Sequence, residues 1–426
     1  MIMWRECKLG DLLEIKHGFA FLGEHFSNEG SHIVLTPGNF FDNGGFKRKE
    51  GKDKWYRGFI PFEYVLSKGD LVVAMTEQAE GLLGSAAIIP ADDLYLHNQR
   101  IGLVQLKYID AADKIFVYYL FNSRPVRHQI RGSASGTKIR HTAPSRIADV
   151  EVSLPPLPTQ RRIAGILSAY DDLIENSQRR IKILEKMARR LYREWFVYFR
   201  FPGHEDCRLV ESPLGEIPEG WEVKSFTEIA DVLSGGTPKT DVPQYWDGEI
   251  PFFTPRDAPD CFYLQDTDKH ISDIGLSKCA SALYPSDTVF ITARGTVGKV
   301  VLPAVNMAMN QSCYALRAKG GVPQRFLFLM TLQQVDYLKT NTGGATFDTI
   351  VVDTFRRMEV VSPTQVIASQ FSELIDPVFE QVNTLQRQLQ NLRRTRDLLL
   401  PRLLSGQIDV EILSEPPDAD QDACKY

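Results

Sequence analysis

One long amphipathic segment constrains this chain more than any other feature. Between Ile163 and Trp195, residues suited to a buried seam recur at alternating steps of four and three, at Ile163, Leu167, Tyr170, Ile174, Ser177, Ile181, Leu184, Ala188, Leu191 and Trp195. This spacing is the 3.5-residue period of a coiled-coil seam. Pro158 precedes it, at a place where a helix start needs no backbone N–H. The pattern predicts a helix over residues 156–200 that buries its seam against a partner.

A second segment near the C-terminus repeats the pattern less strictly and predicts a helix over residues 363–405. Its apolar positions are Phe371, Leu374, Val378, Val382, Leu385, Leu389, Leu392, Leu399 and Leu403. Pro377 is expected to kink or restart this helix. Its start, VVSPTQVIASQF, is interpreted as lacking the paired prolines and the Pro-x-Gln arrangement of LPPLPTQRRI. A helix of about 40 residues is roughly 60 Å long. The simplest arrangement is antiparallel packing of the two helices; the alternative is that each packs on its own module.

The rest of the sequence contains a diverged internal repeat. WRECKLGDLLEIKHG, from Trp4, resembles WEVKSFTEIADVLSGG, from Trp221, at a spacing of 217 residues. The same spacing aligns Gly18 with Gly235. It also aligns Gly69-Asp70-Leu71 with Ser286-Asp287-Thr288, and a spacing of 212 aligns Asn98-Gln99 with Asn310-Gln311. The repeat therefore predicts two similar modules, each followed by a long helix.

Short β-branched runs, turns rich in Gly, Pro and Asp, and a few helical patches make each module a mixed α/β (α+β) domain. We expect two similar globular domains, separated by two long helices that form an antiparallel coiled coil with pseudo-two-fold symmetry. The predicted limits are 1–155 for the first domain, 156–200 for the first helix, 201–212 for a linker, 213–362 for the second domain, 363–405 for the second helix and 406–426 for an acidic tail.

Net charge does not argue against nucleic-acid binding. The formal charge is −5, but residues 405–426 alone carry six acids and one base. Residues 159–200 carry ten Lys or Arg and five Asp or Glu, so charge is unevenly distributed. The six cysteines are scattered without a C-x-x-C pair, and no apolar run is long enough to span a bilayer. We expect a cytoplasmic protein with reduced thiols.

Catalytic and metal-binding motifs are missing. RGTVGKV resembles a phosphate-binding loop, but Ala293 and Val300 replace its first Gly and its Ser or Thr. Asp171 and Asp172 are adjacent on a helix and are interpreted as a solvated face, not as an acid–base pair. His270 lies between Cys261 and Cys279 without ligand spacing, so no metal site is predicted. The sequence indicates a binding protein.

Basic loops with small residues are the candidate DNA-binding segments. Glycine lets backbone approach a phosphate, arginine can bond guanine through two N–H groups, and Ser or Thr adapts to either. The candidates are Arg131, Gly136, Thr137, Lys138, Arg140, Gly236, Thr237, Lys239, Arg294, Thr296, Lys299 and Thr346. The alternative is that these are ordinary surface turns with solvated cations. The aromatic stretch WYRGFIPFEY is interpreted as core and turn packing.

The two modules and the two long helices, taken in their order along the chain, resemble the specificity subunit of type I restriction-modification systems over nearly the whole length. The residues that carry the resemblance are LPPLPTQRRIAGILSAYDDLIE, RRLYREWFVYF, LGEIPEGWEVKSFTEIADVLSGGTP, ITARGTVGK and RDLLLPRLLSGQIDV. The resemblance implies that each domain reads one half of a split, asymmetric double-stranded DNA site. It also implies that the helices set the gap between the halves.

The same resemblance implies the partners and the cofactors. The helices would dock two modification subunits, which bring S-adenosylmethionine and methylate adenine. Restriction subunits would bring ATP-driven translocation and cleavage with Mg²⁺, so this chain itself is expected to bind no cofactor and to be non-catalytic. Two other classes stay open from the residues alone. One is a coiled-coil adaptor that binds only proteins, and the other is a fused DNA methyltransferase or nuclease.

Overall fold

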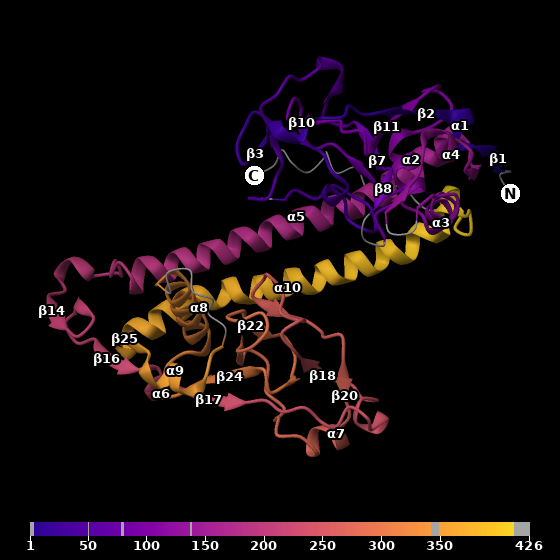
Figure 1. The fold of residues 1–426 in the computed structure, drawn as a ribbon. Helices are drawn as coiled ribbons and strands as arrows, with labels where there is room; N and C mark the ends of the chain where they lie inside the picture. The colour runs from indigo at the N-terminus through magenta and orange to yellow at the C-terminus, as the bar shows by residue number, and fades with distance from the viewer. Residues whose placement is uncertain (1–3, 50, 78–80, 137–138, 342–348, 413–426) are drawn as a thin grey trace. The chain divides into compact units, whose positions relative to one another are not determined.

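The computed structural model describes residues 4–49, 51–77, 81–136, 139–341 and 349–412, and it divides into two compact units. The first unit comprises residues 1–173 and 392–426, and the second comprises residues 174–391. The division falls inside the two long helices, whereas the predicted domain limits treat these helices as separate parts. Each unit therefore contains one module together with a segment of each helix (Figure 1).

The first module is built on a four-stranded antiparallel sheet in the order β2-β11-β7-β9. Its strands are β2 (Leu13–His17), β11 (Ile101–Leu106), β7 (Leu71–Ala74) and β9 (Ala86–Ile88). Every residue of β7 is buried, because α2 (Lys114–Phe121) and α4 (Pro144–Ala148) cover the sheet next to β9 and β2. The strand LVVA is a continuous apolar run, which is typical of a strand covered on both faces.

A second, five-stranded sheet completes this module in the order β3-β5-β4-β10-β6. Its strands are β3 (Phe26–Ser27), β5 (Trp55–Tyr56), β4 (His32–Val34), β10 (Tyr95–Leu96) and β6 (Val65–Leu66). Strands β4 and β10 are parallel. The N-terminal strand β1 (Arg5–Lys8), which leads into α1 (Leu9–Leu12), pairs with β13 (Glu151–Leu154), the last strand before the first long helix. This pairing brings both ends of the module to the start of that helix.

The second module repeats this plan. Its main sheet has the order β17-β24-β21-β22-β19, formed by β17 (Ala230–Ser234), β24 (Cys313–Ala318), β21 (Val289–Thr292), β22 (Val300–Pro303) and β19 (Tyr263–Leu264). A smaller sheet contains β20 (His270–Ile271), β18 (Ile250–Phe253) and β23 (Ala308–Met309), with β18 and β23 parallel. Strand β16 (Glu222–Ser225) pairs with β25 (Glu359–Ser362), as β1 pairs with β13.

The helices of the second module are α6 (Phe226–Ile229), α7 (Asp273–Ser277), α8 (Gln324–Asn341) and α9 (Val352–Arg357). A hairpin of β14 (Leu209–Ser212) and β15 (Gly215–Pro218) precedes the module.

Close backbone contacts confirm the predicted repeat. A Cβ atom at Gly18 would lie 2.2 Å from the carbonyl oxygen of Asn98, and one at Gly235 would lie 2.2 Å from that of Asn310. Both glycines are therefore required by the same close approach. The alignment of one turn has to be shifted by one residue. The backbone amides of Gly69 and Asp287 donate to equivalent carbonyls on the opposite strand of their hairpins. The structural counterpart of Gly69 is thus Asp287 and not Ser286.

The two long helices, α5 (Leu157–Phe196) and α10 (Gln365–Leu404), share a core in each unit. In the first unit, Ile163 and Leu167 of α5 lie in one apolar core with Leu403 of α10. In the second unit, Ala188 and Trp195 lie in one core with the α10 residues Phe371, Ile375 and Phe379. The start of α5 therefore meets the end of α10 and the reverse, which confirms antiparallel pairing.

Three details of the helices correct the sequence predictions. Helix α10 runs without a break through Pro377, so this proline does not restart it. Leu374, a predicted seam residue, is 50% exposed, and Ile375 is buried in its place because it shares a helix face with Phe371 and Phe379. The prediction that the second helix start lacks a Pro-x-Gln arrangement is wrong, because the triplet Pro-Thr-Gln lies at the start of both helices, at residues 158–160 and 363–365.

The glutamine of each triplet donates a side-chain hydrogen bond to a backbone carbonyl of its own module. Gln160 Nε2 donates to the carbonyl of Ala111 at 3.1 Å, and Gln365 Nε2 donates to that of Gly321 at 2.8 Å. In each unit the glutamine therefore ties the first turn of a long helix to its own module. Among the described residues, no helix is long and apolar enough to cross a membrane, and no cluster of three potential metal ligands occurs.

Candidate nucleic-acid interface

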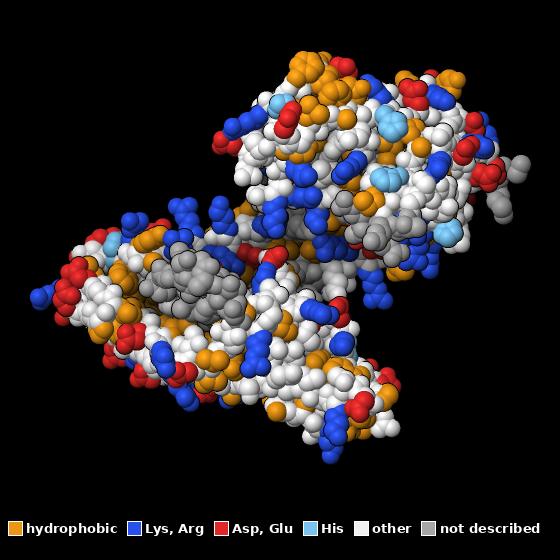
Figure 2. Space-filling view, viewed as in Figure 1, with side chains coloured by type: hydrophobic (Ala, Val, Ile, Leu, Met, Phe, Trp, Pro, Cys, Tyr) orange, Lys and Arg blue, Asp and Glu red, His pale blue; other side chains and the backbone are white. Residues whose placement is uncertain are grey.

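A cationic groove runs beside α3 (Arg124–Gly132) in the first module. The sequence of α3, RPVRHQIRG, places Val126 and Ile130 on the buried face of the helix. Basic residues recur at helical spacing on the opposite face. The groove has a cavity volume of about 690 Å³ and is lined by Arg124, Pro125, Arg127, His128, Arg131, Gly132 and Arg140. Lys, Arg and His side chains are spread over the visible face of this module (Figure 2).

Part of this charge supports the walls of the groove. Arg127 donates through Nε to the carbonyl of Leu83 at 2.9 Å and through Nη2 to that of Gly81. Burial, together with the neighbouring Arg131, lowers the pKa of the Arg127 guanidinium to about 10, so it stays charged at neutral pH. The Glu77 carboxylate accepts from the amides of Gly81 and Leu83 at 3.1 and 2.9 Å and lies 4.0 Å from Arg131 Nε.

The side chains of Arg124, His128 and Arg140 are exposed around these supports. They come from both sides of the groove, because Arg140 belongs to β12 (Arg140–His141), which pairs with β8 (Thr76–Glu77). An array of guanidinium groups at a concave surface suits phosphate oxygens, which accept paired N–H donors. The predicted residues Arg131 and Arg140 therefore lie together, and Arg124 and His128 join them.

The loop that follows α3 is closed by its own backbone. Ser135 and His141 exchange two hydrogen bonds, of 3.0 and 2.9 Å. Gly136 has a φ of +98°, and a Cβ atom there would lie 2.0 Å from the carbonyl oxygen of Ile139. Gly136 is accounted for by this tight turn without any phosphate contact. Thr137 and Lys138 lie outside the described residues, as does Thr346 of the second module.

In the second module, some of the predicted DNA-binding residues are buried and others are exposed. Gly236 is buried, and a Cβ atom at this position would lie 2.5 Å from the backbone nitrogen of Ala280. Close packing accounts for a glycine at this position without any phosphate contact, and the approach of Gly236 to phosphate stays a prediction. The side chain of Lys239 is exposed, and its carbonyl accepts a 3.0 Å hydrogen bond from Trp246 Nε1.

Two of the predicted segments of this module meet at one loop. Thr237 donates to Gln311, and the amide of Ala293 donates to the carbonyl of Ser312 at 2.8 Å. The segments that contain Lys239 and Arg294 are thus held by neighbouring residues. Arg294 and Thr296 are exposed in the turn between β21 and β22, whereas Lys299 forms an ion pair with Asp260.

The sequence comparison shows the family to which the chain belongs. The family described as the type I restriction modification DNA specificity domain matches residues 1–186 and 218–392. The chain belongs to this family. The predicted family and its DNA-specificity role are thereby confirmed, in place of the protein-only adaptor and the fused enzyme.

Relatives of the DNA specificity family agree with this assignment. The MjaIX specificity subunit of Methanocaldococcus jannaschii is 26% identical over 71% of each chain. The HindI specificity subunit of Haemophilus influenzae is 24% identical over 66% of this chain and 73% of its own. The crystal structure of the type I restriction-modification S subunit from M. genitalium shares this fold, with a TM-score of 0.63, 16% identity, and 94% and 96% of the two chains covered.

Some features of this family member were missed from sequence. Arg124 and His128 precede the predicted loop, and their spacing of four residues followed by Arg131 is the signal that indicates one helix face. Asp171, interpreted as solvated, instead accepts hydrogen bonds from Tyr119 and Arg396, whereas Asp172 is exposed. Phe59 and Phe62, interpreted as core or turn packing, are 80% and 85% exposed.

Proposed function

We propose that this chain reads a split, asymmetric DNA site, with each module recognising one half. The observation that carries this proposal is the repeated module, with the same pairing of its first and last strands and the same glycine contacts, each followed by a long helix. The two modules differ in their loop residues. Two similar scaffolds with different loops favour two different half-site sequences held at a defined gap.

In the first module, the α3 groove would hold the DNA backbone while the loop that ends at Arg140 reaches base edges. Arginine can bond the O6 and N7 atoms of guanine through two N–H groups, and each such contact is worth about 1–3 kcal/mol of discrimination. In the second module, the corresponding proposal rests on Thr237, Lys239, Arg294 and Thr296, together with Lys299, whose ion pair with Asp260 would have to open.

We further propose that α5 and α10 dock two modification subunits, and that restriction subunits join them. Apolar side chains on the exposed face of α5 support a protein partner there, because Ile183 is 59% exposed and Met187 is 46% exposed. S-adenosylmethionine, ATP and Mg²⁺ would then bind the partner subunits. Action on DNA would place the assembly in the cytoplasm.

Methylome sequencing of a host that carries the complete system, with and without this gene, tests the proposal. The expected result is adenine methylation at a split site that disappears without the gene. Exchanging residues 1–155 for the first module of another family member should change one half of that site only. A change in both halves would show that the modules do not read DNA independently.

A salt titration of DNA binding by the purified chain separates DNA contact from protein-only binding. Phosphate contacts release counterions, so the logarithm of the binding constant should fall linearly with the logarithm of salt concentration. Binding that is independent of salt, or absent at low salt, would show that the purified chain does not contact DNA phosphates by itself.

A further inference from the structure

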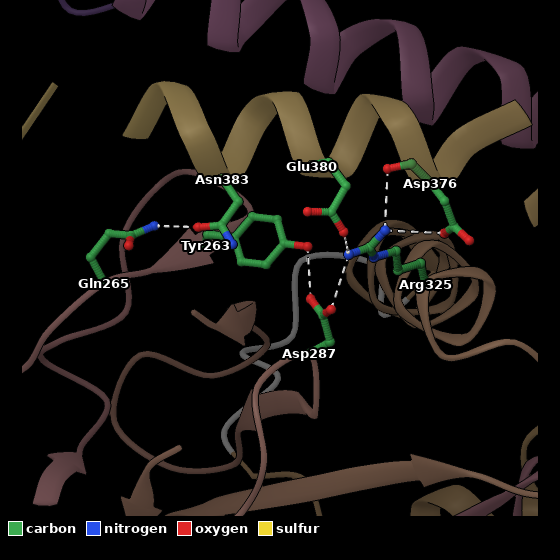
Figure 3. A network of polar contacts seen from close by, with 7 residues as sticks. All are labelled: Tyr263, Gln265, Asp287, Arg325, Asp376, Glu380 and Asn383. Carbon is green, nitrogen blue, oxygen red and sulfur yellow. Dashed lines mark hydrogen bonds and ion pairs between the residues drawn. The ribbon is translucent and has the colours of Figure 1, made fainter. Parts of the chain in front are cut away.

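The second module meets α10 through a cluster of charged side chains around Arg325 (Figure 3). Arg325 lies at the start of α8, and its side chain is 13% exposed. Its Nη2 atom lies 3.0 Å from Asp287 Oδ2 and also contacts Glu380. Its Nη1 atom lies 3.3 Å from Asp376 Oδ1 and donates to the carbonyl of Asp376 at 3.2 Å. One guanidinium group therefore joins a carboxylate of the module to two carboxylates of the helix.

Asp287 supplies the module's carboxylate from a turn. The equivalent position in the first module is a glycine, Gly69. Gly69 has a φ of +84°, and Asp287 has a φ of +63° in the equivalent turn. This left-handed conformation is open to glycine but disfavoured for residues with a Cβ atom. The Asp287 carboxylate also accepts a 2.7 Å hydrogen bond from the Tyr263 hydroxyl. The second module thus has an Asp in a conformation that glycine adopts more readily, and the Asp287 side chain accepts bonds from both Tyr263 and Arg325.

Other contacts between this module and the helices are of two kinds. Polar contacts are made by the amide of Phe262, which donates to Glu185 of α5 at 2.6 Å, and by Gln265, which donates to Asn383 of α10 at 2.9 Å. Apolar contacts include the stacked rings of Phe262 and Phe379, whose centroids are 5.2 Å apart. Apolar contacts are non-directional and permit small rotations, whereas the forked guanidinium bonds permit few orientations.

We propose that Arg325 and Asp287 are positioning residues that set the angle at which the second module is held on α10. That angle determines the register in which the module meets its half of the DNA. The DNA consequence rests on the proposed function, whereas the docking of the module on the helix does not. The two parts are therefore measured separately.

Hydrogen exchange of the full chain, without DNA, tests the docking. The amide of Phe262 is held by Glu185, so its exchange reports separation of the module from the helices. Asp287→Gly removes the carboxylate and suits the turn, and Arg325→Ala removes the guanidinium group. Both should accelerate exchange in peptide 259–264 at least about tenfold, because a partly buried ion pair is broken. Arg325→Lys should recover part of the loss, and the exposed Asp268→Ala should match the wild type. Wild-type exchange in both Asp287→Gly and Arg325→Ala would overturn the proposal.

Methylation of DNA duplexes by the complete complex tests the register. The duplexes carry the site found by methylome sequencing, with its natural gap or a gap one base pair longer or shorter. Asp287→Gly should reduce the preference for the natural gap at least about tenfold, while the same half-site sequences remain required. Faster Phe262 exchange with a wild-type gap preference would overturn the link to DNA register. Wild-type protein without sequence preference would refute the proposed function, and the exchange data would still decide the docking.

Discussion

The hydroxyl of Tyr119 donates a 2.6 Å hydrogen bond to the carboxylate of Asp171, whose other oxygen lies 2.6 Å from Arg396 Nη1. These residues come from α2, α5 and α10, so one carboxylate joins the first module to both long helices within the first unit. The second unit reaches a comparable result with a different arrangement, in which the central group is Arg325. Each module is therefore fastened to its helices by a charged cluster as well as by apolar packing.

Removing the Asp171 carboxylate should destabilise the first unit. Asp171→Ala removes the acceptor of the Tyr119 hydroxyl and one of the two carboxylates that pair with the partly buried Arg396, which keeps Asp397. Hydrogen bonds to charged groups contribute about 1.5–3 kcal/mol. We expect the free energy of unfolding, measured by urea denaturation, to fall by about 2–3 kcal/mol. The neighbouring Asp172→Ala is the control and should stay within about 0.5 kcal/mol of the wild type, because Asp172 is exposed. Equal effects of the two substitutions would contradict this interpretation.

Exposed cations of the α3 groove should govern the salt dependence of DNA binding. Arg124→Ala and Arg140→Ala each remove a charge without removing a contact that holds the groove together. We expect weaker binding and a slope of log binding constant against log salt that is smaller by about 0.9 for each lost phosphate contact. Lys68→Ala, an exposed cation at a distant turn of the sequence, is the control. If both groove variants keep the wild-type slope in fluorescence anisotropy titrations, the groove does not contact phosphate.

A buried carboxyl group should give the second unit a pH-dependent stability. Burial raises the pKa of Glu185 from 4.5 to about 7. Between these values the folded state holds a proton that the unfolded state has released, so this contribution is complete below pH 4.5 and is lost as pH rises through about 7. The free energy of unfolding should therefore fall with rising pH by up to about 1.4 kcal/mol per unit.

Glu185→Gln should remove this dependence. His97 acts in the opposite sense, because burial lowers its pKa from 6.5 to about 4 and makes stability rise with pH in that window. The measurement is therefore the difference between the unfolding free energies of the variant and the wild type at each pH. A difference that is constant from pH 4.5 to pH 7 would show that Glu185 does not titrate in the folded chain.

Glycine substitutions should separate packing from DNA contact. Gly236→Ala places a Cβ atom 2.5 Å from the backbone of Ala280, so we expect a loss of about 1–3 kcal/mol in unfolding free energy. Gly23→Ala is the matched control, because nothing lies within 4 Å of a Cβ atom there and the residue does not line the groove. Calorimetric unfolding of both variants provides the comparison. A stable Gly236→Ala protein with weakened DNA binding would instead restore Gly236 to the interface.

The periodic features of the fold could be predicted from sequence because they depend on local spacing. The seam from Ile163 to Trp195 and the glycines at 18 and 235 are examples, since helix period and close backbone approach leave regular marks. The positions of Leu374 and Ile375 could not be predicted in this way. Neighbouring apolar residues on a helix differ by about 100° in direction, and the surrounding core selects between them.

The candidate site was predicted only in part, because its residues are brought together by the fold. Arg131 and Arg140 were found from a basic loop, but Arg124 reaches the same groove from a helix whose buried face had to be known first. Asp171 looked solvated because its partners, Tyr119 and Arg396, are distant in sequence. The correspondence of Gly69 with Asp287 depends on hairpin hydrogen bonds that sequence spacing misplaces by one residue.

The first unit contains residues from both ends of the described sequence, and this affects when it can fold during synthesis. Leu403 and Val410 belong to the same apolar core as Leu9 and Ile163. The first module therefore closes this core only after residues 403–410 have been translated, although the module itself is translated first. Until then the seam of α5 stays uncovered. Contacts between residues that are far apart in sequence form slowly, and the exposed apolar surface is prone to aggregation in the meantime. Fragments that end before Leu403 should therefore expose this seam to other chains.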